Sequence, residues 1–183
     1  MNIFMDVSYI NIYIYQKFIM ATIRQNQNIV KGDELWLFVG TSATTKPICF
    51  STSHQLSRSL ATNSVSSKDH GNTSYVVPGE GSWTCSTEAL MSIAAGDENS
   101  LAFTELMDIF DSADPTVYVT FGKLSNYTAA GIVDVDGAAE WTIGTPNWTG
   151  KGYITSLQAS GGHGDSATMS IEITGLGPLA KNA

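Results

Sequence analysis

The chain has 183 residues, with 17 Asp and Glu against 9 Lys and Arg, which gives a formal net charge of −8. Hydrophobic residues make up 43% of the chain and charged residues only 14%, so the composition excludes a disordered acidic tail and a coiled coil. The length suits one domain with a substantial buried core. The acid excess argues against a protein that grips nucleic acid through its phosphates.

The negative charge is concentrated in the middle of the chain. No Lys or Arg lies between Lys68 and Lys123. The same stretch holds nine acidic residues, which are Asp69, Glu80, Glu88, Asp97, Glu98, Glu105, Asp108, Asp111 and Asp114. Such a stretch is either an interaction or repulsion surface, or a means of keeping the protein soluble.

Residues 1–19 differ in composition from the rest of the chain. Fifteen of them are Ile, Tyr, Asn, Phe, Met or Lys, which have AT-rich codons, and this bias stops at Met20. The segment lacks the basic start, unbroken apolar stretch and cleavage site of a signal peptide, and it is too short and too polar to span a membrane. We therefore expect residues 1–19 to be a non-native extension from a mis-assigned start, with residues 20–183 forming a single domain.

The first half of the chain is predicted to consist of short strands. The runs rich in strand-forming residues are 34–39, 47–52, 55–65 and 81–89. In the last run Trp83, Cys85 and Thr87 alternate with polar residues, which is typical of a half-buried strand. Cys49 and Cys85 both lie in apolar strand-like stretches, so we expect buried free thiols rather than a disulfide or a zinc site.

Residues 68–78 are predicted to form an extended loop or a protruding arm. The sequence His70-Gly71-Asn72 is a turn signature, because Gly and Asn readily adopt positive φ. The segment is too long for a simple two-residue hairpin.

One amphipathic helix follows. Its expected core face, at helical spacing, consists of Phe103, Leu106, Met107 and Phe110. Asn99 or Ser100 would cap the helix, and Pro115 would end it.

Strands resume after the helix, over residues 117–121, 127–135, 148–159 and 166–174. In the last of them, Met169, Ile171 and Ile173 alternate and are expected to be buried. The whole pattern predicts a mostly β (α+β) fold, in which two packed antiparallel sheets form a sandwich or barrel with one flanking helix.

The sequence shows no convincing active site, so we expect neither catalysis nor a metal or cofactor. His70 beside Asp69 and His163 near Asp165 could meet at a metal, but their spacing matches no ligand motif. The chain has no Gly-x-Ser-x-Gly nucleophile motif, and neither cysteine has an electropositive setting. Residues 161–164 are glycine-rich but lack the Lys and Ser/Thr of a phosphate loop, so a hairpin turn is expected there.

Two segments of the chain carry a more specific resemblance. In residues 66–90 the matching positions are Ser67, Lys68, Asp69, Gly71, Gly79 and Trp83, and in residues 149–179 they are Gly150, Gly152, Ile154, Thr155, Asp165, Thr168, Gly175 and Gly177. With these motifs the chain, from about Met20 to its end, resembles the major tail tube proteins of long-tailed bacteriophages, in particular the TP901-1-like tail protein family. His70 and the insert at 72–77 depart from the commoner short form of the turn.

The resemblance implies a structural protein that assembles into stacked hexameric rings, the tail tube of a phage or prophage. DNA would pass through without specific binding, and some of the central acids would face the lumen to repel phosphate. Implied partners are further copies of the chain, the tape-measure protein and the tail terminator and baseplate proteins, in the virion tail and, during assembly, in the host cytoplasm. A loop reaching the next ring would set the stacking, and its candidate residues are Lys68, Asp69, His70, Gly71, Asn72, Tyr75 and Val76.

Two other functions fit the sequence less well. The nearer alternative is a type VI secretion-like tube or another tail component, such as a connector or terminator. The more distant one is a secreted carbohydrate-binding or adhesin β-sandwich, which needs an export signal and exposed aromatic residues. Trp36, Trp83, Trp141 and Trp148 are available, but the alternation around Trp83 places that residue in the core.

Overall fold

The computed structural model describes residues 30–42, 44–66, 68–71, 73–93, 100–125, 127–128, 131–132 and 141–183. All of its strands and its α-helix lie in the compact unit Asp33–Ala183. The expected start at Met20 and the segment 1–19 fall outside the described residues. No helix in the described part of the chain is both long enough and apolar enough to cross a membrane.

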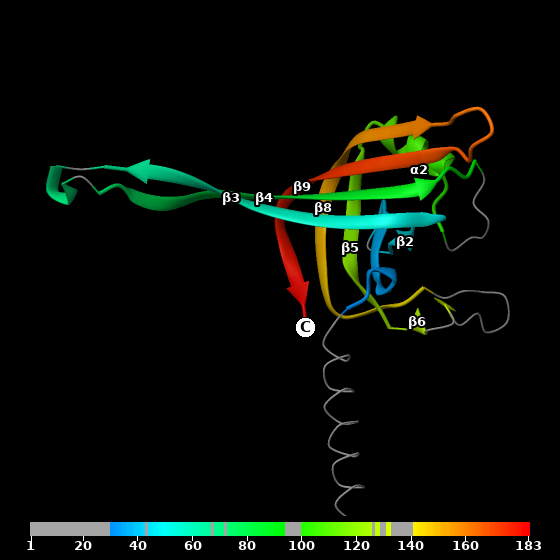
Figure 1. The fold of residues 1–183 in the computed structure, drawn as a ribbon, viewed down its shortest axis with the longest axis horizontal. Coiled ribbons are helices and arrows are strands. Elements are labelled where there is room, and N and C mark those ends of the chain that lie inside the picture. The colour runs from blue at the N-terminus through cyan, green and yellow to red at the C-terminus, as the bar shows by residue number, and fades with distance from the viewer. Residues whose placement is uncertain are drawn as a thin grey trace, which may run out of the picture. The chain divides into compact units, whose positions relative to one another are not determined.

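Seven strands form one antiparallel sheet in the order β2-β1-β5-β8-β9-β4-β3 (Figure 1). Their bounds are Leu35–Gly40 for β1, Lys46–Pro47 for β2, Ser51–Val65 for β3, Tyr75–Leu90 for β4, Thr116–Leu124 for β5, Ile143–Ser160 for β8 and Thr168–Asn182 for β9. The other described elements are the short ladder of β6 (Tyr127–Thr128) and β7 (Gly131–Ile132), the 3₁₀ turns η1 (Gly32–Glu34) and η2 (Lys68–His70), and the helix α2 (Phe103–Phe110). The prediction of a mostly β fold with one helix is confirmed.

The main strands lie in one sheet rather than in the two packed sheets expected. This sheet bends so that strands near its two ends come into contact. The ring of Trp36 in β1, the second strand in the order, lies 5.4 Å from that of His54 in β3, the last strand. β8 has two register shifts in its pairing with β9, the first between Thr149 and Lys151, and such bulges bend a strand and increase its twist. Figure 1 shows β3 and β4 crossing β5 steeply. One bent sheet therefore takes the place of the two packed sheets that were expected.

The core fills the space inside this bend. Trp83 and Cys85 of β4 are buried, as the alternation in residues 81–89 predicts, and Ile171 and Ile173 of β9 lie on the same face. Leu37 of β1 belongs to the same apolar cluster. Both cysteines of the chain are free and buried, so the prediction of buried thiols is confirmed.

The helix α2 begins later than the sequence suggests. Its N-cap is Ala102 rather than Ser100, and Asn99 lies outside the described residues. The carboxylate of Glu105 accepts a hydrogen bond from the backbone N–H of Ala102 at 2.9 Å. Ser100 instead lies buried, and its hydroxyl oxygen accepts a hydrogen bond from the thiol of Cys49 at 2.8 Å.

The core face of α2 also differs from the expected set. Leu106 is fully buried, Phe103 packs against the core and Met107 is half-buried. Phe110 is 39% exposed, and Ile109 packs against the core in its place. Because Phe110 is the last residue of an eight-residue helix, no further turn holds it against the sheet, and it does not belong to the core face.

Several strands depart from the predicted limits. β4 begins at Tyr75, inside the segment 68–78 expected as an extended loop or a protruding arm, and β9 continues to Asn182. The run 47–52 is not one strand, since β2 ends at Pro47 and β3 starts at Ser51.

Candidate functional site

The outer parts of β3 and β4 form a two-stranded arm. β4 pairs with β9 only from Thr84 to Leu90, whereas its pairing with β3 continues out to Tyr75 and Val65. Residues 58–65 and 75–83 are here named the arm, and the described residues between them (66, 68–71, 73 and 74), which include η2, are named the arm tip. At about 3.3 Å per residue, segment 75–83 spans roughly 30 Å. Figure 1 shows this ribbon extending from the bent sheet.

The arm exposes apolar side chains on both of its faces. Its exposed large apolar residues are Leu60, Val65, Tyr75, Val76 and Val77. Val65 and Tyr75 are cross-strand partners and share one face, while Val76, next along β4, points to the other. An isolated two-stranded ribbon is marginally stable in water, and apolar surface of this kind marks a contact with another protein. The arm is therefore a candidate assembly element.

Trp83 anchors the arm at its root. Its Nε1–H donates a hydrogen bond to the backbone carbonyl oxygen of Gly177 at 2.9 Å, and its side chain is buried. A Cβ added at Gly175 would overlap the indole ring, and one added at Gly150 would lie 2.7 Å from its Cζ2 atom. The motif glycines thus provide the space that the indole occupies.

A groove of about 670 Å³ lies beside this anchor. Its apolar lining includes Leu60, Trp83 and Leu179, and two exposed charged residues, Arg58 and Glu80, also line it. We name it the root groove. It joins the base of the arm to the last part of β9.

The face of the sheet opposite the core is polar over β3, β4, β9 and β8. A depression of about 360 Å³ on this polar face is lined by Ser53, Gln55, Ser86, Glu88, Ser156, Gln158, Ser170 and Glu172, with Thr87 and Ile171. The hydroxyl of Ser53 donates to the carboxylate of Glu88 at 3.3 Å. This lining carries two carboxylates and neither Lys nor Arg, so the face combines negative charge with hydroxyl and amide groups.

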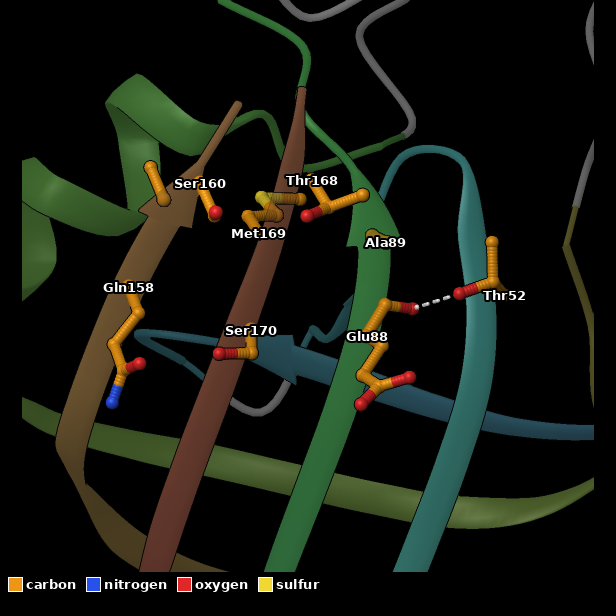
Figure 2. Close-up of a pocket in the computed structure, with 9 residues that line it drawn as sticks. Thr52, Glu88, Ala89, Gln158, Ser160, Thr168, Met169 and Ser170 are labelled. Atoms are coloured by element: carbon orange, nitrogen blue, oxygen red, sulfur yellow. Dashed lines mark hydrogen bonds between the residues drawn. The ribbon is translucent and has the colours of Figure 1, made fainter. Parts of the chain in front are cut away.

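A second depression, of about 320 Å³, lies at the end of the same strands. Figure 2 shows Gln158, Ser170 and Glu88 on neighbouring strands, with the hydroxyl of Thr52 donating to the backbone carbonyl oxygen of Glu88 at 3.1 Å. The lining has one carboxylate and no His, Cys or Lys.

Within the described ranges, no three His, Cys, Asp or Glu side chains come together in a way that could hold a metal ion. Asp165 lies in the turn between β8 and β9, where its backbone N–H donates to the carbonyl oxygen of Gly162 at 3.2 Å. The prediction of a hairpin turn at this glycine-rich segment is confirmed, because β8 and β9 pair in antiparallel fashion on either side of it.

His54 is a feature that the sequence pattern did not single out. Its ring contacts that of Trp36, and its Nδ1 atom lies 3.0 Å from the hydroxyl oxygen of Thr87. Burial lowers the pKa of His54 to about 4. Trp36 also contacts Trp141, with ring centroids 4.5 Å apart, so these aromatic rings contact one another rather than forming an open platform.

The candidate loop residues lie on the arm and its tip. Lys68, Asp69 and Gly71 are exposed at the arm tip, Tyr75 and Val76 are exposed at the start of β4, His70 belongs to η2, and Asn72 lies outside the described residues.

Comparison with known families decides between the possible roles. A family described as "Phage tail tube protein" matches residues 30–181. The chain belongs to this tail tube family. The resemblance noted at residues 66–90 and 149–179 is thereby confirmed, and the family is one of structural proteins. A search of curated protein sequences found no match.

Solved structures show the tail tube fold in related particles. A chain from the virion of a native gene transfer agent is similar with a TM-score of 0.60 and 16% identity, over 85% of this chain and 100% of that chain. A chain from the tail of an empty particle of that kind, refined with C6 symmetry, gives 0.59 and 19%, over 85% and 100%. The SPP1 tail tube gives 0.57 and 11%, over 85% and 80%. At these identities the likeness establishes the fold.

Proposed function

We propose that this tail tube protein forms six-membered rings that stack into the tube through which DNA leaves the particle. The observation that carries the proposal is the tail tube family match over residues 30–181. The C6 symmetry of a similar tail supports six subunits per ring. The role is structural and without catalysis, in the virion tail after assembly in the host cytoplasm. Tape-measure, terminator and baseplate proteins are its proposed partners.

An open sheet edge supports ring formation. β3 is the last strand in the sheet order and runs for 15 residues, so among the described strands none pairs with the outer side of its backbone. Long unpaired edges favour pairing with another chain. When subunits close into a ring, each such edge can pair with a neighbouring subunit, and no subunit is left with an unpaired edge.

We further propose that the polar face lines the bore of the tube. Glu88 and Glu172 are the carboxylates of its larger depression, and no Lys or Arg lies beside them there. A bore of this kind repels DNA phosphates, whereas clustered cations would retain DNA by releasing its counterions. Glu105 and Asp108 lie on α2, on the core side of the sheet, and are proposed to lie outside the bore.

The arm is proposed to make the contact between rings, with Lys68 and Asp69 at its tip. The apolar surface exposed on both faces of the arm supports this role. A ribbon of about 30 Å is long enough to reach a neighbouring subunit.

Electron microscopy of the purified full-length chain tests the proposal. We expect hexameric rings and stacked tubes in negative stain, and persistent monomers at high concentration would contradict it. The bore is tested with Glu88→Lys combined with Glu172→Lys. These tubes should retain DNA at low salt and release it at high salt, whereas wild-type tubes and the turn variant Asp165→Lys should not retain it. Equal DNA retention by all three would show that the polar face does not line the bore.

A further inference from the structure

We infer that the root groove of one copy receives the arm tip of a second copy. This inference rests on the proposed self-assembly and adds the receiving surface, which the tube-forming role does not specify. The two surfaces in contact would be the root groove and the arm tip, which lie at opposite ends of the arm in each copy.

The first argument is apolar matching. The root groove offers Leu60, 59% exposed, together with the edges of Trp83 and Leu179. The end of the arm next to the tip offers Val65, 51% exposed, and its cross-strand partner Tyr75, 58% exposed, which share one face. Burying such side chains against each other is favourable, because it removes apolar surface from water.

The second argument is charge complementarity. The root groove carries one cation, Arg58, and one anion, Glu80. The arm tip carries one anion, Asp69, and one cation, Lys68, adjacent in sequence and both exposed. A tip that enters the groove can therefore place Asp69 beside Arg58 and Lys68 beside Glu80. Such pairs fix the register of a contact, because like charges placed together are strongly unfavourable.

The third argument is that a subunit cannot fill its own groove. The arm is a continuous antiparallel ribbon from Arg58 paired with Trp83 out to Val65 paired with Tyr75, so its tip stays roughly 30 Å from its root. Each copy thus has one tip and one groove for other copies. A contact between two different patches of one chain is head-to-tail and propagates through an assembly, as stacking requires.

Charge exchange tests the contact. Arg58→Glu and Asp69→Arg should each lower the yield of sedimentable tubes about tenfold, because each replaces an opposite-charge pair by like charges. The double variant Arg58→Glu with Asp69→Arg restores the pair in reversed order and should recover most of the yield. Asp165→Arg, a charge reversal in a turn outside the groove and the tip, is the matched control and should assemble normally. Far-UV circular dichroism confirms folding of each variant.

A cross-link provides a second measurement that does not depend on the charge variants. Leu60→Cys combined with Lys68→Cys should give disulfide-linked ladders of subunits when assembled tubes are oxidised, whereas Asp165→Cys with Lys68→Cys should not. The inference would be overturned if the Arg58 and Asp69 charge variants all assembled like wild type and the cysteine pair gave no ladder. The proposed function would then remain intact. Wild-type protein that never assembles would overturn both.

Discussion

Replacing Gly175 by alanine tests the anchoring of the arm. The indole of Trp83 lies where the new Cβ would be placed, and the same ring also lies close against Gly150. The ring must therefore shift. Its hydrogen bond to the carbonyl oxygen of Gly177, 2.9 Å long, lengthens or breaks as it does so.

The expected cost combines two effects. Overpacking a buried site costs about 1–3 kcal/mol, and losing the hydrogen bond adds about 0.5–1.5 kcal/mol, so the free energy of unfolding should fall by about 2–4 kcal/mol. Gly150→Ala places a Cβ 2.7 Å from Trp83 and should cost less, about 1–2 kcal/mol. Gly161→Ala, whose Cβ would lie 3.5 Å from Ala167, is the matched control, with a change within about 0.5 kcal/mol.

Urea unfolding of dilute, unassembled protein measures this series, and the near-ultraviolet circular dichroism of the tryptophans reports the shift of the ring. Gly175→Ala should also assemble poorly at temperatures where it remains folded, because Trp83 lies at the root of the arm. If Gly175→Ala and Gly161→Ala unfold at the same urea concentration with unchanged tryptophan spectra, the indole does not occupy the space described.

Other predictions follow from buried groups. Because the pKa of His54 is lowered to about 4 from its usual 6.5, unfolding binds a proton below pH about 6.5. Stability should therefore fall as the pH drops towards 4, by up to about 1.4 kcal/mol per pH unit, and His54→Gln should flatten this dependence in urea titrations. Burial raises the pKa of Cys85 to about 12, so neither it nor the buried Cys49 should react with a thiol reagent at pH 8 until the protein is unfolded, and fast labelling would contradict the packing. Leu106→Ala should destabilise by about 2–5 kcal/mol and Phe110→Ala by less than about 1 kcal/mol, and equal losses would contradict the observed face of α2.

The sequence patterns predicted local structure well where one strand face is buried. The alternation of Trp83, Cys85 and Thr87 identified the inner half of β4, because period-two burial is a local property. The start of β4 at Tyr75 was missed, since Pro78 and Gly79 interrupt strand patterns and the pairing with β3 that holds this segment is not visible locally. Likewise the bend of a single sheet depends on bulges in β8, which no periodicity reveals.

The candidate surfaces were predicted only in part. The segment around Lys68 was expected to protrude, and it lies at the arm tip. The root groove could not be predicted, because it brings Arg58 together with Leu179, which are distant in sequence. Glu172 lies outside the acidic middle of the chain, so the charge pattern does not single it out, and only strand pairing places it beside Ser86 on β4. The motif glycines at 150, 175 and 177 were recognised as a pattern, and their physical role is to surround Trp83.

The point where β4 leaves β9 has a consequence for the unassembled subunit. Their ladder stops at the pair Thr84 and Thr174, and further along β9 comes Gly177, with a φ of +77°, followed by Pro178. A proline has no N–H to donate, so a regular ladder between β4 and β9 would lack a hydrogen bond beyond this point. Pro78, in the arm, likewise has no N–H to donate to another strand. The β4 part of the arm of an unassembled subunit is therefore paired with β3 alone, and we expect it to stay separate from β9 before assembly.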